Sequence, residues 1–311
     1  MSNPLQNSAA LPEFSKIKPE HIQPAVEQAI AKCRDTIETL LASNSEYTWD
    51  NLIAPLEEVD DELSKVWSPV SHMNSVVSSD ALRDAHDACL PLLSDYGTFV
   101  GQHQGLYDAY KSIHQSADFA LLTQAQKKVI EQSLLDFELS GIGLDDSQKA
   151  RYGEIVKRLS ELTSNFSNQL LDATEAWTKL ITNEADLAGL PESAVAAAKA
   201  MAEAKEQKGW LFTLDFPSYL PVMTYSENRE LREECYRAFV TRASDQGPNA
   251  GEFDNTNNMN EIVALRHELA NLLGFASYAH KSLATKMAES PEQVLGFLNE
   301  LGQRSKGQAA T

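Results

Sequence analysis

The sequence predicts a mainly α-helical protein, a large multi-helix domain with one minor strand or hairpin element. Apolar residues recur at three- and four-residue spacing along almost the whole chain, which is the period of an amphipathic helix. Helix start signals precede several of these segments. Residues 210–216 instead group aromatic residues and threonine, as strands do. No segment repeats at a fixed period, so a solenoid is not predicted.

The first two helices are predicted from buried stripes. One begins near Pro24, a residue suited to a first helical turn, and its apolar positions continue to Leu41. The other follows Thr48, and we expect Pro69 to interrupt it because proline disfavours a helical residue before it.

Two further helices are predicted by their start signals. The first begins after Ser79 and contains a proline, Pro91, that is expected to kink it. The second begins at a capping box, in which Thr123 and Gln126 can each bond the backbone N–H of the other. It is expected to end at Gly141.

The longest predicted helix covers about residues 146–182, and an alanine-rich helix follows over 191–208 with Gly209 at its end. Residues 210–216 form the predicted strand, which Pro217 ends. Because one strand needs a partner, a small hairpin or an added edge is expected.

The remaining chain is predicted as three helices and one long loop. The first helix contains Leu231 and Phe239. The loop over 244–258 concentrates Gly, Pro, Asn and Asp, and its length suggests a functional or interface role. A helix over 259–273 stops at a glycine, and the last helix begins at Ser290 as N-cap.

Composition and charge exclude some partners. Hydrophobic residues make up 42% of the 311 residues and charged residues 23%, as in ordinary globular proteins. The formal net charge of −19 repels nucleic-acid phosphates and anionic membranes. We therefore expect no nucleic acid and no membrane as partner. An acidic surface could favour cationic ligands, although a well-solvated surface is the simpler interpretation.

The cysteines and the N-terminal residues indicate a cytoplasmic protein. Cys33, Cys89 and Cys235 are odd in number and far apart, which argues against a disulfide framework. Residues 1–14 lack the cationic and apolar regions of a signal peptide. No apolar run is long enough to cross a membrane.

One stretch comes close to a metal motif. Residues 264–275, "ALRHELANLLGF", contain His267, Glu268 and Asn271, where H-E-x-x-H would bind zinc through two histidines. His267 and Asn271 are expected to share the helix face opposite the buried one. A neutral amide oxygen is a poor zinc ligand. We therefore interpret His267 as a structural or exposed residue, and a metal site using His267 and Glu268 as the weakest alternative.

No complete catalytic constellation is present, so no catalytic, substrate-binding or metal-ligating residue is predicted. The sequence contains no C-x-x-C pair, no phosphate-binding glycine loop and no G-x-S-x-G elbow. The acid pairs Asp60-Asp61 and Asp145-Asp146 are interpreted as solvated faces and helix starts rather than acid–base couples.

Seven stretches together resemble the N-terminal part of the thimet oligopeptidase and neurolysin family of zinc metallopeptidases, and in particular its bacterial cytosolic members. The resemblance covers about residues 11–304. The stretches are "LPEFSKIKPEHIQPAVEQAI", "SPVSHMNSVVSS", "LLDFELSGIGL", "LDFPSYLPVMTY", "YRAFVTRASDQGPNAGEFDN", "ALRHELANLLGF" and "SLATKMAESPEQVLGFL".

The resemblance implies the N-terminal half of the neurolysin-like peptidase fold, in which two helical halves flank a deep channel for short peptides. It implies that the zinc ligands and the catalytic glutamate lie in the C-terminal half, which has no counterpart here. Zinc is therefore expected for the complete family enzyme and not for this chain. The implied organisation is a helical N-terminal domain over residues 1–304 and a divergent tail over 305–311, consistent with a truncation, a split gene or a gene-model artefact.

Two functions follow from this resemblance. The first is a non-catalytic N-terminal part that forms one wall of the substrate channel, needs the C-terminal catalytic half as partner and is inactive alone. The alternative is a stand-alone helical scaffold that binds peptides or proteins. An exposed apolar surface that would face the other half favours the first.

Overall fold

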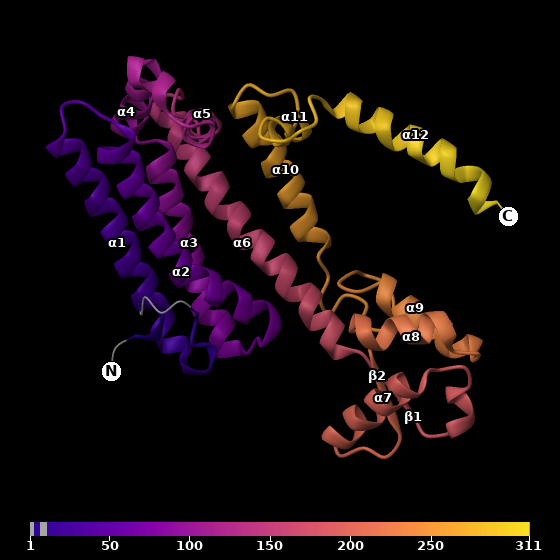
Figure 1. The fold of residues 1–311 in the computed structure, drawn as a ribbon. Coiled ribbons are helices and arrows are strands. Elements are labelled where there is room, and N and C mark those ends of the chain that lie inside the picture. Colours follow the sequence, from indigo (N-terminus) through magenta and orange to yellow (C-terminus); the bar gives the residue numbers. More distant parts are fainter. Residues whose placement is uncertain (1–2, 7–10, 311) are drawn as a thin grey trace. The chain divides into compact units, whose positions relative to one another are not determined.

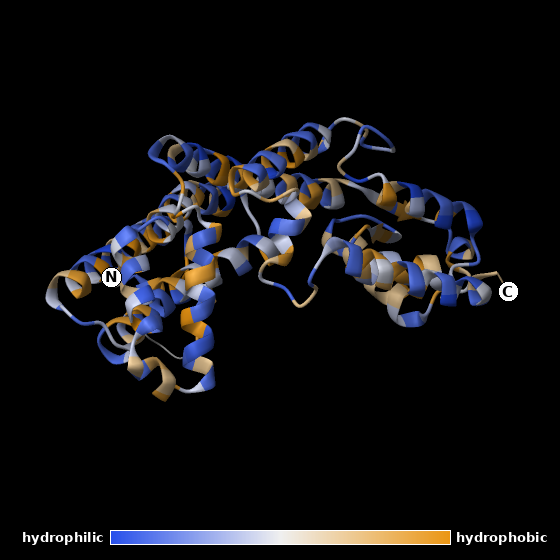
Figure 2. Ribbon diagram, turned by 90° about the horizontal axis from the view of Figure 1, so that it is seen from above, coloured by the Kyte–Doolittle hydropathy of each residue, from blue (hydrophilic) through white to orange (hydrophobic). Residues whose placement is uncertain are grey.

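The computed structural model describes residues 3–6 and 11–310 and is mainly helical, as predicted (Figure 1). The chain forms two compact units, one of Met1–Glu161 with Ala264–Thr311 and the other of Leu162–Val263. Figure 2 shows hydrophobic and hydrophilic residues alternating along most of the helices. None of the helices in the described ranges is long and apolar enough to cross a membrane.

Most of the helices belong to the first unit. They are α1 (Pro19–Ser43), α2 (Ala54–Val76), α3 (Asp80–Gly101), α4 (Gln104–Gln115), α5 (Gln124–Leu139), α11 (Tyr278–Leu283) and α12 (Pro291–Ala309). Two helices belong partly to each unit, α6 (Asp146–Ala176) and α10 (Thr256–Leu272). Short helical turns are η1 (Pro4–Gln6), η2 (Phe14–Lys16), η3 (Trp49–Ile53), η4 (Ala117–Leu121) and η5 (Glu184–Leu187).

The main core of the first unit lies between α1, α2 and α3, which run alongside one another (Figure 1). On α1 the buried side chains recur every three or four residues, including Ile22, Val26 and Ile30. Full burial of such a side chain contributes about 1.5–3 kcal/mol. Packing of these faces therefore stabilises the helices more than their intrinsic propensities do.

Two prolines, Pro69 and Pro24, lie inside helices, contrary to the prediction for each. The prediction that Pro69 interrupts a helix was wrong, because α2 continues to Val76 and buries both Pro69 and Val70. Apolar packing at these positions compensates for the backbone hydrogen bond that proline cannot donate. Likewise α1 begins at Pro19, so Pro24 lies inside the helix rather than in its first turn.

Three helices were missed: α4, α11 and, in the second unit, the helix over Phe216–Tyr225. α4 has no Ser, Thr, Asp or Asn before it, because its N-cap is His103, whose Nδ1 accepts from the Leu106 N–H at 3.2 Å. Histidine is not among the usual capping residues, so no start signal marked this helix. α11 has only six residues, too few to show a helical period.

Three predicted helix ends are confirmed. The Thr123 hydroxyl accepts from the Gln126 N–H at 3.3 Å, and the Gln126 side chain accepts from the Thr123 N–H at 2.9 Å. Ser290 caps α12 by accepting from the Gln293 N–H at 3.2 Å. Gly274 follows α10 with φ of 82°, the left-handed conformation that glycine adopts without steric cost.

In the second unit, the described residues form one two-stranded antiparallel sheet of β1 (Thr178–Ile181) and β2 (Trp210–Thr213). The expected partner strand is therefore present, but the helix predicted to reach residue 182 ends at Ala176. The predicted strand is also shorter than expected, since Phe216 already begins the next helix.

Three helices accompany this sheet, α7 (Glu192–Ala204), α8 (Phe216–Tyr225) and α9 (Arg229–Val240). They build a second core around Phe212, Leu214 and Val222. Gly209 does not end α7 as predicted. The helix ends at Ala204, and Gly209 instead begins the approach to β2 with φ of 130°.

Candidate functional site

The near-metal motif lies on α10, and its apolar residues attach that helix to α6. Leu269 of α10 is buried with Tyr152 and Ile155 of α6 in a small cluster of the first unit. His267 and Glu268 lie on the exposed side. The spacing that resembles a zinc helix is therefore also the spacing of an amphipathic helix packed on its neighbour.

Glu268 is held by an arginine. Its Oε1 accepts from Arg151 Nε at 2.7 Å and its Oε2 from Arg151 Nη2 at 2.9 Å, while Arg151 Nη1 also donates to Glu154 at 2.8 Å. The Arg151 guanidinium lowers the pKa of the Glu268 carboxyl. A general base needs a pKa near the working pH, so this carboxylate is unsuited to proton abstraction. Its ion pair with Arg151 instead links α10 to α6, and we call this contact the inter-helix tie.

His267 and Asn271 share one face of α10, as predicted, and they contact each other. The Asn271 side-chain nitrogen lies 2.9 Å from His267 Nε2. In residues 3–6 and 11–310, no three His, Cys, Asp or Glu side chains are grouped so that they could hold a metal. The side chains of this motif therefore do not fit a zinc ion, which needs three or four such ligands.

Other histidines serve local structure. The His86 ring stacks on Trp67 with centroids 4.8 Å apart, and its Nδ1 lies 2.8 Å from Asp87 Oδ1. His103 caps α4 and places its Nε2 3.2 Å from Glu38 Oε1. The stacking of His86 on Trp67 and the two contacts of His103 were not predicted, because they join residues of different helices or involve an unusual cap residue.

The three cysteines are buried and free. Burial raises the pKa of the Cys89 thiol to about 11 and that of Cys235 to about 12. A cysteine nucleophile needs the opposite shift, toward a thiolate at neutral pH. These side chains therefore act as small core residues.

The acid pairs mostly serve helix starts and surface contacts, as predicted. Asp145 precedes α6, and its carboxylate accepts from the Gln148 N–H at 2.9 Å, which lowers its pKa. Asp61 forms an ion pair with Lys65. Asp60 differs, because it accepts a hydrogen bond at 2.9 Å from the phenol of Tyr96 on α3.

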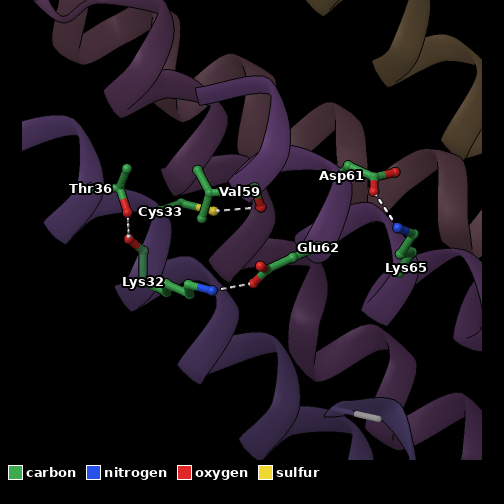
Figure 3. Close-up of polar contacts among 7 residues, drawn as sticks. All are labelled: Lys32, Cys33, Thr36, Val59, Asp61, Glu62 and Lys65. Carbon is green, nitrogen blue, oxygen red and sulfur yellow. Dashed lines mark hydrogen bonds and ion pairs between the residues drawn. The ribbon is translucent and has the colours of Figure 1, made fainter. Parts of the chain in front are cut away.

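A groove with a volume of about 570 Å³ lies between α1 and α2, and four of the charged side chains that line it form two ion pairs (Figure 3). Lys32 Nζ lies 2.5 Å from Glu62 Oε2, and Lys65 pairs with Asp61. Nearby, the buried Cys33 thiol donates to the Val59 carbonyl of α2 at 3.5 Å. A small-molecule site needs convergent polar groups that are free to bind a ligand, whereas these four side chains already pair with one another.

These observations define a mainly helical protein. The polar side chains considered above form hydrogen bonds and ion pairs with one another. Comparison with known proteins identifies the family. The model described as "Neurolysin/Thimet oligopeptidase, N-terminal domain" matches residues 26–149, and the model described as "Peptidase family M3" matches residues 222–310. The chain belongs to peptidase family M3, the family of neurolysin and thimet oligopeptidase.

Curated relatives match along nearly the whole chain. It is 61% identical over 308 residues to Oligopeptidase A of Salmonella typhimurium and 63% identical over 308 residues to Oligopeptidase A of Haemophilus influenzae, in both cases 99% of this chain and 45% of the relative. It is 37% identical to a probable cytosolic oligopeptidase A of Arabidopsis thaliana, over 94% of this chain and 42% of the relative. The chain thus spans less than half the length of these relatives.

Replacing Glu268 with glutamine tests its role as an inter-helix tie. The folded-state pKa of Glu268 is lowered, so its contribution to stability is present above its ordinary pKa of 4.5 and is lost as the pH falls through the lower folded-state value. We expect Glu268→Gln to lower the urea midpoint slightly at pH 7, because both side chains are half exposed to solvent. The difference from the parent chain should shrink progressively as the pH is lowered below 4.5.

A double-mutant cycle with Arg151→Gln isolates the pair. The expected coupling is positive at pH 7 and absent in 1 M salt. An effect of Glu268→Gln that does not diminish as the pH is lowered from 7 through 4.5 and below would show that the carboxylate does not act through its charge.

Proposed function

We propose that this chain is the non-catalytic N-terminal part of a zinc-dependent oligopeptidase that degrades short cytosolic peptides. It forms one wall of the substrate channel and requires a C-terminal catalytic part. The observation that carries this proposal is the coverage of the relatives named Oligopeptidase A, which match 99% of this chain but only 45% of their own length.

The chemistry of the side chains supports this division. Zinc-dependent hydrolysis of a peptide bond needs three protein ligands and a metal-bound water. The nearest sequence match, around Glu268, offers a carboxylate already engaged by Arg151 and a histidine beside an amide. We therefore assign the metal and the reaction to the C-terminal part. This chain contributes peptide binding and orientation, which position a substrate for attack from the opposite wall.

Reconstitution of activity tests the proposal. The purified 311-residue chain is assayed with a quenched-fluorescent oligopeptide and zinc, alone and after addition of the separately purified remainder of the Salmonella relative. We expect no cleavage by the chain alone and zinc-dependent cleavage by the mixture. The remainder of the relative without this chain is the matched control and should cleave much more slowly.

Cleavage by the chain alone that a chelator abolishes would refute the proposal. If the mixture neither associates nor cleaves while the chain alone still binds oligopeptides, the stand-alone scaffold becomes the better description.

A further inference from the structure

We propose that the exposed apolar face of α12 is the surface through which this chain binds the C-terminal part of an oligopeptidase A-type protein. This inference rests on the proposed function and adds the surface. The partner is the part of these relatives, more than half of their length, that lies outside their match to this chain.

α12 is an amphipathic helix without a covering neighbour in the described residues. Leu295, Phe297, Leu298 and Leu301 are exposed by 58%, 65%, 52% and 51%. At about 100° per residue, Phe297, Leu298 and Leu301 share one side of the helix with the half-buried Val294. The first three turns of α12 therefore present an apolar stripe to solvent.

Comparison with α1 shows how unusual this is. Both helices are long, with 25 residues in α1 and 19 in α12, but α1 buries six side chains and α12 buries none. Helices in proteins are stabilised mainly by packing of an apolar face. α12 has an apolar face, but no other element of the described residues buries that face. In Figure 1 the helix leads away from α11 toward the C-terminus. Contiguous exposed apolar residues of this kind mark interaction surfaces.

The family match favours the C-terminal part over other occupants. The peptidase-family model reaches residue 310, so α12 lies within that family segment, and more than half of each relative lies outside the match. A second copy of this chain fits less well, because each copy has a formal charge of −19.

Matched double variants test the surface. Phe297→Glu with Leu301→Glu places two charges in the apolar stripe, and Asn299→Glu with Gln303→Glu places the same two charges on the opposite side. Binding of the remainder of the Salmonella relative is measured by titration calorimetry. We expect the first variant to bind at least about 30-fold more weakly, and the second to bind within about 2-fold of the parent chain. Circular dichroism melting should be unchanged in both, because neither alters a buried residue.

The outcomes separate this inference from the function on which it rests. If the parent chain associates and cleaves peptide but both variants bind equally well, the surface is wrong and the function stands. If the parent chain neither associates nor supports cleavage, the function fails first. Light scattering of the chain alone gives a third outcome. If the parent chain is a dimer, and only the variant with Phe297→Glu and Leu301→Glu is a monomer, the face is occupied by a second copy and the inference is overturned.

Discussion

Phe212→Ala should destabilise the second unit by about 3–5 kcal/mol, the usual loss when a buried phenylalanine is truncated. Phe212 lies in β2, is 1% exposed and belongs to the core that α7, α8 and α9 share with the sheet. Removing the ring loses the favourable free energy of burying it away from water, and it leaves a cavity that the surrounding backbone cannot fill. This is a large part of the stability of a domain of ordinary size.

The measurement must report on the second unit. Of the four tryptophans, Trp49 and Trp67 lie in the first unit, and replacing them with phenylalanine leaves Trp177 and Trp210 as reporters. Urea unfolding followed by tryptophan fluorescence in this background then gives the free energy of unfolding.

The matched control is Phe216→Ala. This residue has the same side chain in the same unit but is 60% exposed, so its truncation should change stability by less than about 0.5 kcal/mol. Equal losses from the two substitutions would contradict the placement of Phe212 in the core.

Gly209→Ala should cost about 2–4 kcal/mol, because backbone strain and a steric clash add. Gly209 has φ of 130°, a conformation that L residues rarely adopt. A Cβ atom there would lie 2.2 Å from the carbonyl oxygen of Ile181, which is paired with Trp210 in the sheet. Since the obstructing atom is backbone, relief requires the two strands to separate.

Gly251→Ala separates the two causes. Gly251 also has a positive φ, 78°, but no heavy atom lies within 4 Å of a Cβ built there. We expect a loss of only about 1–2 kcal/mol, the cost of the left-handed backbone alone. Fluorescence unfolding in the same tryptophan background measures both variants. A Gly209→Ala loss no larger than that of Gly251→Ala would show that the strands accommodate the methyl group.

The correct predictions depend on residues that are close together in the sequence. The capping box of Thr123 and the stop at Gly274 each depend on residues within one turn, and both are confirmed. Where prediction failed, the decisive contacts are distant in sequence. β1 forms because residues 178–181 pair with β2 about thirty residues later, although their apolar pattern continues that of a helix.

The site could be predicted only in part. The shared face of His267 and Asn271 follows from helix geometry alone, and it is present. The arginine that engages Glu268 lies 117 residues earlier in the chain, and no spacing rule connects the two positions. In the sequence, the exposed stripe of α12 has the same pattern as a buried helix face. The periodicity shows which residues form an apolar face, but not whether another element packs against that face.

The three inaccessible thiols make this chain suitable for site-directed spectroscopy. Because burial keeps the pKa of Cys89 and Cys235 far above neutrality, a maleimide at pH 7 should spare them in the folded protein. A cysteine introduced on the surface would then carry a spin label or fluorophore without prior removal of the native ones, and distances between the two units could be measured in solution.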